Sequence, residues 1–436
     1  MSETFLNGRV TLHAGDSRDV LRTIADCSID SIVTDPPYAL VSISKRFGAA
    51  NAAAVKVPEG KSGAYKRASA GFMGKQWDTG ETAFAVEFWA ECLRVLKPGG
   101  HVVAFSGTRT YHRMACAIED AGFEVRDMLS WLYGSGFPKS HDVAKSLDKR
   151  GGHYRGQRGV PIPFQSVAKG QEYTRNPKGS PVLDEAKQWD GWGTALKPAC
   201  EPICFGRKPL IGTVAANVLE YSTGAINVDG CSIGDEVRVN QPMGAPENSY
   251  GGYEFRSPAT ATATATAGRW PANLVHDGSE EAIAHFPVDG DGESAARYFY
   301  SAKADASDRI GSKHPTVKPV DLMQWLCRLV TPPGGTILDP FSGTGTTGEA
   351  AYREGFNAVL IEREPEYQAD IRRRMGLVLS GPDERSRESI KAKTAGQPID
   401  AGPLFGGLDT PPRRVGESTE YSRTNNRTDR IEVGNE

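Results

Sequence analysis

The residues whose types and spacing could do chemistry lie in two short segments far apart in the chain. The first is DPPY, residues 35–38, and the second is DPFSGTGT, residues 339–346. Each follows an apolar run that is typical of a buried strand, and open α/β sheets bind ligands at the carboxyl ends of their strands. We therefore expect both segments to contact ligands.

The second segment contains a glycine loop, residues 343–348, with the G-x-G-x-x-G spacing of dinucleotide sites. Asp339, Pro340 and Phe341 stand between the strand and these glycines, and a carboxylate there disfavours a diphosphate and favours a cationic ligand. Glu362 closes the next predicted strand, where an acidic residue binds the two hydroxyls of an adenosine ribose. An adenosine whose other end carries an ammonium and a sulfonium is S-adenosyl-L-methionine, which the pattern therefore predicts. The simpler interpretation is a tight turn without a ligand.

The first segment offers hydrogen-bond acceptors and a flat ring. The Asp35 carboxylate and the Pro36 carbonyl are two acceptors that match the two hydrogens of an exocyclic amino group. Pro36 and Pro37 lack an N–H and fix φ, so the turn is rigid. Tyr38 supplies an aromatic face on which a planar base can stack. The structural alternative is a strand that ends in two prolines beside a half-buried tyrosine.

Two blocks of alternating strand and helix patterns position these segments. They span residues 1–138 and 314–378, and such alternation is typical of a parallel sheet covered by helices on both faces. The pattern leaves open two α/β domains or one sheet built from both ends of the chain. Between the blocks lie a basic stretch, a strand pattern at 194–210 and a weakly patterned stretch at 211–313. Residues 379–436 are polar and punctuated by Pro and Gly, so we expect a disordered tail.

The combination of DPPY with a D-P-F-x-G-x-G-T loop resembles the DNA amino-methyltransferases of the beta subgroup, in particular its bacterial, phage and prophage members. The resemblance implies a Rossmann-like, permuted methyltransferase fold with one mixed seven-stranded sheet. In that fold residues 1–138 form the catalytic half, 194–210 the returning strand and 314–378 the half that binds the cofactor. Residues 139–193 become a basic insertion, and 211–313 become an inserted target-recognition region.

The same resemblance assigns the site residues one by one. KHPTVKP, residues 313–319, is similar to a family segment in which Thr316 and Lys318 lie near the methionine end of the cofactor. In HAGDSRDVL, Asp16 contacts the cofactor's adenine or only caps a helix. The catalytic residues implied are Asp35, Pro36, Pro37 and Tyr38. The cofactor-binding residues implied are Asp16, Thr316, Lys318, Asp339, Pro340, Phe341, Gly343, Gly345, Thr346 and Glu362.

The resemblance predicts a site-specific methyltransferase that uses S-adenosyl-L-methionine to modify N6 of adenine in double-stranded DNA. Asp at the first motif position favours adenine, because cytosine-N4 enzymes more often carry Ser there; cytosine stays the main alternative. Enzymes that modify RNA or a protein glutamine more often use Asn-Pro-Pro-Tyr. A catalytically inactive DNA-binding protein is disfavoured by the intact motifs, and a dehydrogenase by the lack of a hydride-handling acid or base with a carboxylate clamp.

Composition sets the remaining expectations. The 436 residues carry a net charge of −3, but residues 139–208 hold 13 Lys/Arg against 7 Asp/Glu, which suits phosphate contact or only a solvated face. Residues 229–293 hold 3 basic against 11 acidic residues. The 7 cysteines include no C-x-x-C pair, and no apolar run is long enough to span a bilayer. We expect no metal site and a cytoplasmic protein of a bacterial or phage-infected cell. A homodimer and a cognate restriction nuclease stay open.

Overall fold

The computed structural model describes residues 2–38, 82–136, 140–153, 180–240, 264–284, 286–288, 292–302, 306–312, 314 and 316–394. The chain divides into a compact unit, Met1–Lys393, and a second unit, Thr394–Glu436, of which all but the first residue lies outside the described part. No helix among the described residues is long and apolar enough to cross a membrane.

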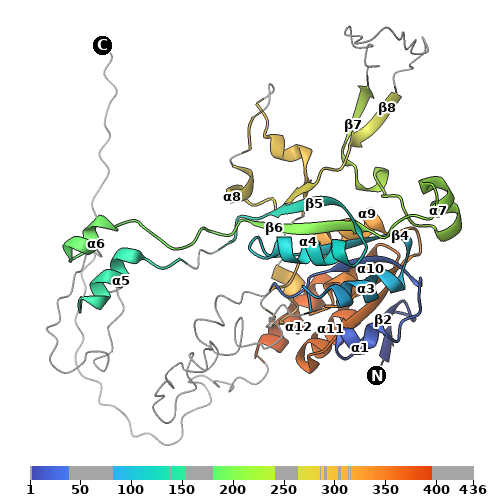
Figure 1. The fold of residues 1–436 in the computed structure, drawn as a ribbon, viewed down its shortest axis with the longest axis horizontal. Coiled ribbons are helices and arrows are strands. Elements are labelled where there is room, and N and C mark those ends of the chain that lie inside the picture. The colour runs from blue at the N-terminus through green and yellow to red at the C-terminus, as the bar shows by residue number, and fades with distance from the viewer. Residues whose placement is uncertain are drawn as a thin grey trace, which may run out of the picture. The chain divides into compact units, whose positions relative to one another are not determined.

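A single sheet dominates the compact unit (Figure 1). Its strands are, in spatial order, β1 (Ser2–Phe5), β2 (Val10–Ala14), β12 (Asn357–Glu362), β11 (Thr336–Asp339), β3 (Ile29–Thr34), β4 (Leu96–Phe105), β6 (Cys200–Arg207), β5 (Glu124–Leu132), β9 (Leu274–His276) and β10 (Tyr300–Ser301). The strands from β2 to β4 are parallel, and β6 lies antiparallel between β4 and β5.

The sheet joins the two ends of the chain, as the family resemblance implies and as the strand and helix pattern alone left open. β11 pairs with β3, so that Ile337 lies opposite Ser31 and Leu338 opposite Ile32. The predicted count of seven strands is wrong, because the sheet has ten. The additional strands are β1, an antiparallel edge strand, and the short pair β9 and β10 from the weakly patterned stretch. Strands of two to four residues are too short to show an alternating pattern in the sequence.

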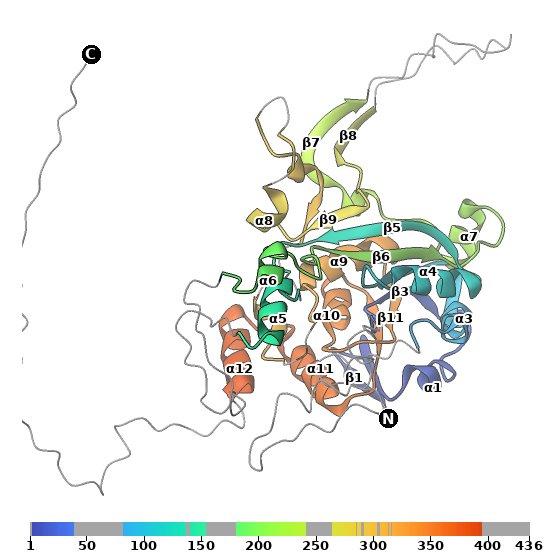
Figure 2. The same cartoon turned by 60° about the vertical axis from the view of Figure 1, so that its left-hand side comes forward.

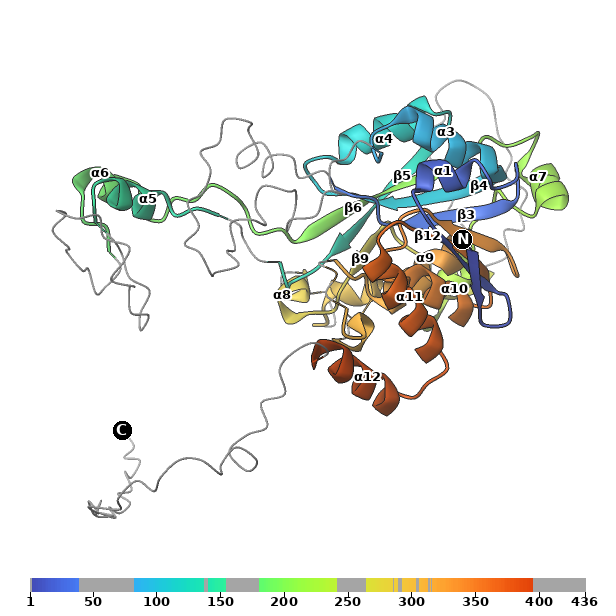
Figure 3. The same ribbon diagram turned by 90° about the horizontal axis from the view of Figure 1, so that it is seen from below.

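Helices cover both faces of this sheet (Figure 3). One face carries α1 (Ser17–Leu21), α3 (Val86–Val95) and α4 (Tyr111–Asp120), and the other carries α9 (Val320–Val330), α10 (Thr346–Arg353) and α11 (Pro365–Leu377). Two apolar clusters fill the two faces, with Trp89 fully buried in one and Trp325 almost fully buried in the other. α3 ends at Val95, because Leu96 has an extended backbone and begins β4.

The remaining elements lie outside this layered core. They are α5 (Val143–Arg150), α6 (Asp184–Gln188), α7 (Val214–Tyr221), α8 (Glu280–Ile283), α12 (Pro382–Thr394), the strands β7 (Ile233–Asn240) and β8 (Thr264–Arg269), and short 3-10 turns at Asp229–Cys231, Ala295–Tyr298 and Ala306–Arg309. The strands β7 and β8 pair antiparallel as a separate two-stranded ribbon, which is visible in Figure 2.

The disorder expected from residue 379 onward does not hold for α12. Arg385 on this helix is buried and pairs with Glu349 on α10 at 2.8 Å. The helix is anchored by an ion pair rather than by an apolar stripe, so hydrophobic periodicity could not reveal it. The rest of the predicted tail, residues 395–436, lies outside the described residues.

Candidate active site

A cavity of about 1280 Å³ opens at the carboxyl ends of the parallel strands. Every site residue predicted from the sequence lines it, with the single exception of Gly345. The lining residues from that prediction are Asp16, Asp35, Pro36, Pro37, Tyr38, Thr316, Lys318, Asp339, Pro340, Phe341, Gly343, Thr346 and Glu362. The two motifs therefore meet in one cavity, although residues 39–338 separate them in the chain.

The two carboxylate oxygens of Asp35 differ in their hydrogen bonding. β3 ends at Thr34, so Asp35 is the first residue beyond the strand. Its Oδ2 accepts a hydrogen bond of 2.6 Å from Lys318 Nζ. Its Oδ1 is buried and has no hydrogen-bond partner among the described residues. A buried acceptor without a partner is unfavourable, which marks Oδ1 as the atom that a ligand would satisfy.

The ring of Tyr38 is held from both its backbone and its hydroxyl. Thr110 Oγ1 donates a hydrogen bond of 2.9 Å to the Tyr38 carbonyl, and the Tyr38 hydroxyl donates one of 2.8 Å to Glu201 Oε2. Gly107 lies beside the ring, because a Cβ there would come within 3.3 Å of Tyr38 Cδ2. Burial and the nearby carboxylates raise the pKa of Tyr38 well above its ordinary value, so the hydroxyl keeps its proton.

The glycine loop connects β11 to α10. Gly343 N donates to Glu362 Oε2 at 2.8 Å, and Glu364 N donates to Glu362 Oε1 at 2.7 Å. Gly345 precedes α10 with φ of +77°, and a Cβ there would lie 3.0 Å from Ile371 Cγ1. Gly345 thus shapes the loop without lining the cavity, because a side chain would be strained and crowded at that point.

Asp339 connects the loop to the end of β3, directly before the first motif. Its carboxylate accepts hydrogen bonds from Thr34 Oγ1, Thr347 Oγ1 and Phe341 N. Burial raises the pKa of Asp339 to about 6 and that of Glu362 to about 7, although hydrogen bonds to both carboxylates oppose the shift. Both acids therefore sit in surroundings that disfavour their charge, as is common at functional sites.

Three further predicted residues have defined surroundings. Asp16 caps α1 by accepting from Arg18 N at 3.0 Å, and it also lines the cavity. Thr316 is exposed, and its carbonyl lies 2.9 Å from a ring nitrogen of His314. Lys318 is buried against Asp35 rather than extending into open space. Their roles toward a cofactor stay predictions.

Sequence analysis missed Glu201. This residue is the second of β6, and its Oε2 lies 3.1 Å from Lys318 Nζ. Because β6 runs antiparallel to β4, its first residues lie beside the carboxyl end of β4, where Phe105 pairs with Ile203. The available signal was a charged residue at the start of a strand that is otherwise buried.

A family model described as DNA methylase of the N6/N4 type matches residues 29–209 and 212–373, which is more than half of the chain. The type II methyltransferase M.HindIII of Haemophilus influenzae is 24% identical over 270 residues, 61% of this chain and 60% of that protein. The type II methyltransferase M2.DpnII of Streptococcus pneumoniae is 41% identical over 68 residues, 16% of this chain and 25% of that protein. The chain thus spans less than two thirds of the length of these two relatives.

Among solved structures, the cytosine-N4-specific PvuII DNA methyltransferase is similar with a TM-score of 0.42 and 14% identity, over 90% of this chain and 94% of that one. The family match covers the strands that carry both motifs as well as β6 with Glu201. With both halves of the sheet included in that match, the chain belongs to the N6/N4 DNA methylase family.

Proposed function

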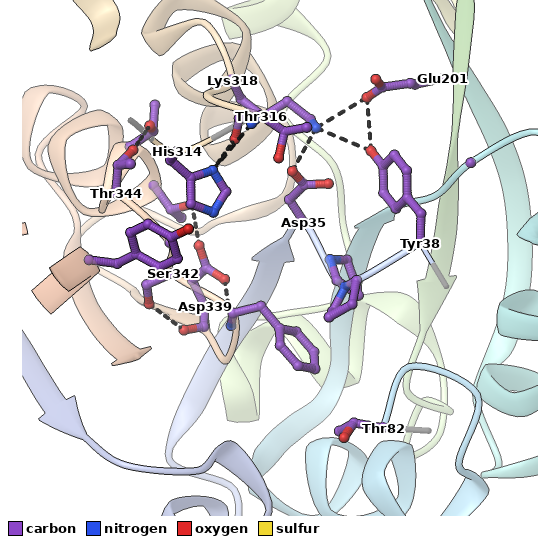
Figure 4. Close-up of a pocket in the computed structure, with 18 of the residues that line it drawn as sticks. Asp35, Tyr38, Thr82, Glu201, His314, Thr316, Lys318, Asp339, Ser342 and Thr344 are labelled. Carbon is purple, nitrogen blue, oxygen red and sulfur yellow. Dashed lines mark hydrogen bonds and ion pairs between the residues drawn. The ribbon is translucent and has the colours of Figure 1, made fainter. Parts of the chain in front are cut away.

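We propose that this protein transfers a methyl group from S-adenosyl-L-methionine to the N6 amino group of adenine in double-stranded DNA. The observation that supports this most directly is the buried Asp35 Oδ1, which has no hydrogen-bond partner among the described residues. It lies in the same cavity as Tyr38 (Figure 4). An exocyclic amino group is a donor that satisfies this oxygen while its ring stacks on an aromatic face.

At the base end of the cavity, the chain's own residues prepare the nucleophile. The target adenine leaves the duplex at a cost of a few kcal/mol and stacks on Tyr38. Its amino hydrogens are donated to Asp35 Oδ1 and to the Pro36 carbonyl. These bonds draw the nitrogen toward tetrahedral geometry, localise its lone pair and leave Asp35 placed to accept a proton. Positioning and electrostatic stabilisation supply the rate enhancement.

The other end of the cavity fits the cofactor. When bound, S-adenosyl-L-methionine supplies an electrophilic methyl group. Each oxygen of Glu362 accepts one backbone N–H and has a second acceptor site, which suits the two hydroxyls of a ribose. Asp16 at the adenine and Thr316 toward the methionine end complete the proposed site, together with the loop residues 339–346. Lys318 lies where the methionine end of the cofactor would meet the base.

DNA contacts are assigned to the two inserted regions. His141 near the start of the basic insertion lines the cavity, as do Thr194 and Lys197 just after its end. We assign entry of the flipped base to this side of the cavity. Residues 139–208 carry an excess of Lys and Arg that suits a phosphate backbone. The region 211–313 contributes β9 and β10 to the sheet and is proposed to take part in target recognition.

The proposal is tested by incubating the protein with S-adenosyl-L-methionine and unmethylated genomic DNA, then measuring methylated nucleosides by mass spectrometry. N6-methyladenine is expected. Asp35→Ala should reduce its formation on the order of 10³-fold while cofactor binding survives, because the base loses its acceptor and the glycine loop is unchanged. Gly345→Asp should abolish cofactor binding, since it places a side chain at φ of +77° against Ile371.

Other outcomes would overturn specific parts. N4-methylcytosine would retain the mechanism but replace adenine by cytosine as the base. Normal cofactor affinity in Gly345→Asp would contradict the loop assignment. Tight cofactor binding without any methylated base would contradict the enzymatic proposal and favour an inactive DNA-binding protein.

A further inference from the structure

The Lys318 ammonium lies between two carboxylates at the base end of the cavity. Its Nζ is 2.6 Å from Asp35 Oδ2 and 3.1 Å from Glu201 Oε2, and it donates a hydrogen bond of 3.1 Å to the Tyr38 hydroxyl. Figure 4 shows the ammonium facing all three side chains. The side chains of Lys318, Asp35 and Glu201 are 6%, 19% and 16% exposed, so bulk water screens their interaction little.

Glu201 contacts two groups that position the substrate. Its Oε2 accepts from the Tyr38 hydroxyl at 2.8 Å and pairs with the Lys318 ammonium. Without Glu201 the ammonium would be free to approach both oxygens of Asp35 and cover Oδ1, the acceptor that the amino group needs. The Tyr38 hydroxyl would also lose its acceptor and keep only the hydrogen bond from Lys318.

The charges in this cluster match the charge that develops during the reaction. Two carboxylates and one ammonium give a net charge of −1. The amino nitrogen becomes cationic as its bond to the methyl carbon forms and the carbon–sulfur bond breaks, leaving that electron pair on sulfur. The nitrogen then gives its proton to Asp35 Oδ1, and the cluster becomes neutral. A fixed negative charge therefore stabilises the transition state more than the ground state.

The geometry points to Glu201 as a positioning residue for methyl transfer that acts through Lys318. Glu201 holds the ammonium against Asp35 Oδ2, so that Oδ1 faces the substrate amino group, and it fixes the hydroxyl of Tyr38. This role rests on the proposed methyltransferase function and adds to it a residue from β6, outside both sequence motifs.

The ion pairs also predict a pH dependence. Burial alone lowers the pKa of Lys318, but the carboxylates of Asp35 and Glu201 outweigh it and raise that pKa above its ordinary value. Among the described residues, the Tyr38 hydroxyl, Tyr133, Cys200 and Asp339 also interact with the cluster. Burial raises the pKa of Tyr133 to about 12 and that of Asp339 to about 6, and it raises the pKa values of Tyr38 and Cys200 above their ordinary values. Removing the Glu201 charge removes stabilisation of the cation, so Lys318 should lose its proton at a lower pH.

The test is single-turnover methylation of DNA at saturating cofactor. Glu201→Gln should slow the rate constant about 10- to 100-fold while the dissociation constant for S-adenosyl-L-methionine stays unchanged. Glu124→Gln is the matched control. It breaks the ion pair between Glu124 on β5 and Arg207, which lies on β6 as Glu201 does but outside the cavity. Tyr38→Phe keeps the ring and removes only the hydroxyl, and it should slow the reaction less than Glu201→Gln.

Two further measurements separate positioning from general destabilisation. If Glu201 acts through Lys318, Glu201→Gln added to Lys318→Met should cause little further loss, because both remove the same interaction. The single-turnover rate constant should also be measured between about pH 6 and 10. For Glu201→Gln it should decline at the alkaline end, where Lys318 loses its proton, while the wild-type rate constant does not decline. Additive effects, an unshifted profile or wild-type activity in Glu201→Gln would overturn the inference. Inactivity of the wild-type protein would instead contradict the proposed function.

Discussion

At the scale of single residues, Glu362 both holds the backbone of the glycine loop and carries a carboxyl group whose pKa is shifted. Its carboxylate receives backbone N–H groups from Gly343 and Glu364, while burial raises its pKa to about 7. The folded chain therefore prefers the protonated acid. For this group the free energy of unfolding is highest below its ordinary pKa and falls as the pH rises toward about 7.

Binding of S-adenosyl-L-methionine should strengthen as the pH rises through about 7. Ribose hydroxyls donate hydrogen bonds and so favour the ionised carboxylate, whereas at lower pH Glu362 must first lose a proton. Titration calorimetry between about pH 5.5 and 8.5 would measure the trend. Glu362→Gln cannot ionise and should bind weakly with little change near pH 7; retention of the wild-type pH profile would count against the ribose assignment. Asp339, with a pKa of about 6, is present in the wild type and in Glu362→Gln. Its titration therefore contributes to both pH profiles and does not account for a difference between them.

At the scale of elements, a buried ion cluster connects α12 to the glycine loop. Glu349 on α10 pairs with Arg374 on α11 at 2.7 Å and with Arg385 on α12 at 2.8 Å. Arg374 Nε also donates 2.8 Å to the Thr344 carbonyl within the loop. The three charged side chains are at most 8% exposed, so each depends on the others for compensation of its charge.

Glu349→Gln should lower the free energy of unfolding by about 3–5 kcal/mol, because two buried guanidinium groups lose the carboxylate that they share. Cofactor affinity should fall as well, since Arg374 then holds the loop less firmly. Denaturant unfolding and calorimetry would measure the two effects. Arg387→Ala, an exposed position on α12, is the control and should change stability by less than about 0.5 kcal/mol. A Glu349→Gln protein as stable as this control would refute the role of the cluster.

At the scale of the whole molecule, charge is distributed unevenly along the chain. His141 near the start of the basic insertion and Thr194 directly after its end line the cavity, whereas residues 229–293 are acidic. The described part of the insertion contains α5, whose last turn carries the exposed Lys149 and Arg150. Duplex DNA presents one negative charge about every 1.7 Å, so the basic segment is the part suited to phosphate contact.

Reversing both charges, Lys149→Glu with Arg150→Glu, should weaken DNA binding about tenfold or more at physiological salt. The slope of log Kd against log salt concentration should fall by about 2, one for each lost phosphate contact. Fluorescence anisotropy across a salt series would measure both quantities. The double reversal Arg387→Glu with Lys391→Glu on α12 changes the same charge at exposed positions. Equal loss in both variants would show a general charge effect rather than a DNA contact in α5.

The two motifs and the α/β character could be predicted from the sequence, because they depend on local properties. Prolines or glycines directly after a strand determine the backbone conformation in which the chain leaves the sheet. Residues 35–38 and 339–346 each lie at such a strand end. All predicted site residues but Gly345 line the same cavity. The resemblance to methyltransferases correctly joined both ends of the chain into one sheet.

The tertiary structure alone decided which charges meet and where the sheet ends. Glu201 reaches Tyr38 across 163 positions because β6 runs antiparallel beside β4, a direction that no local pattern records. The strands β9 and β10 are too short to show a hydrophobic period, and α12 is held by a buried ion pair instead of an apolar face. Local periodicity specifies an element through its own backbone geometry, whereas the pairing of buried charges depends on how distant elements pack.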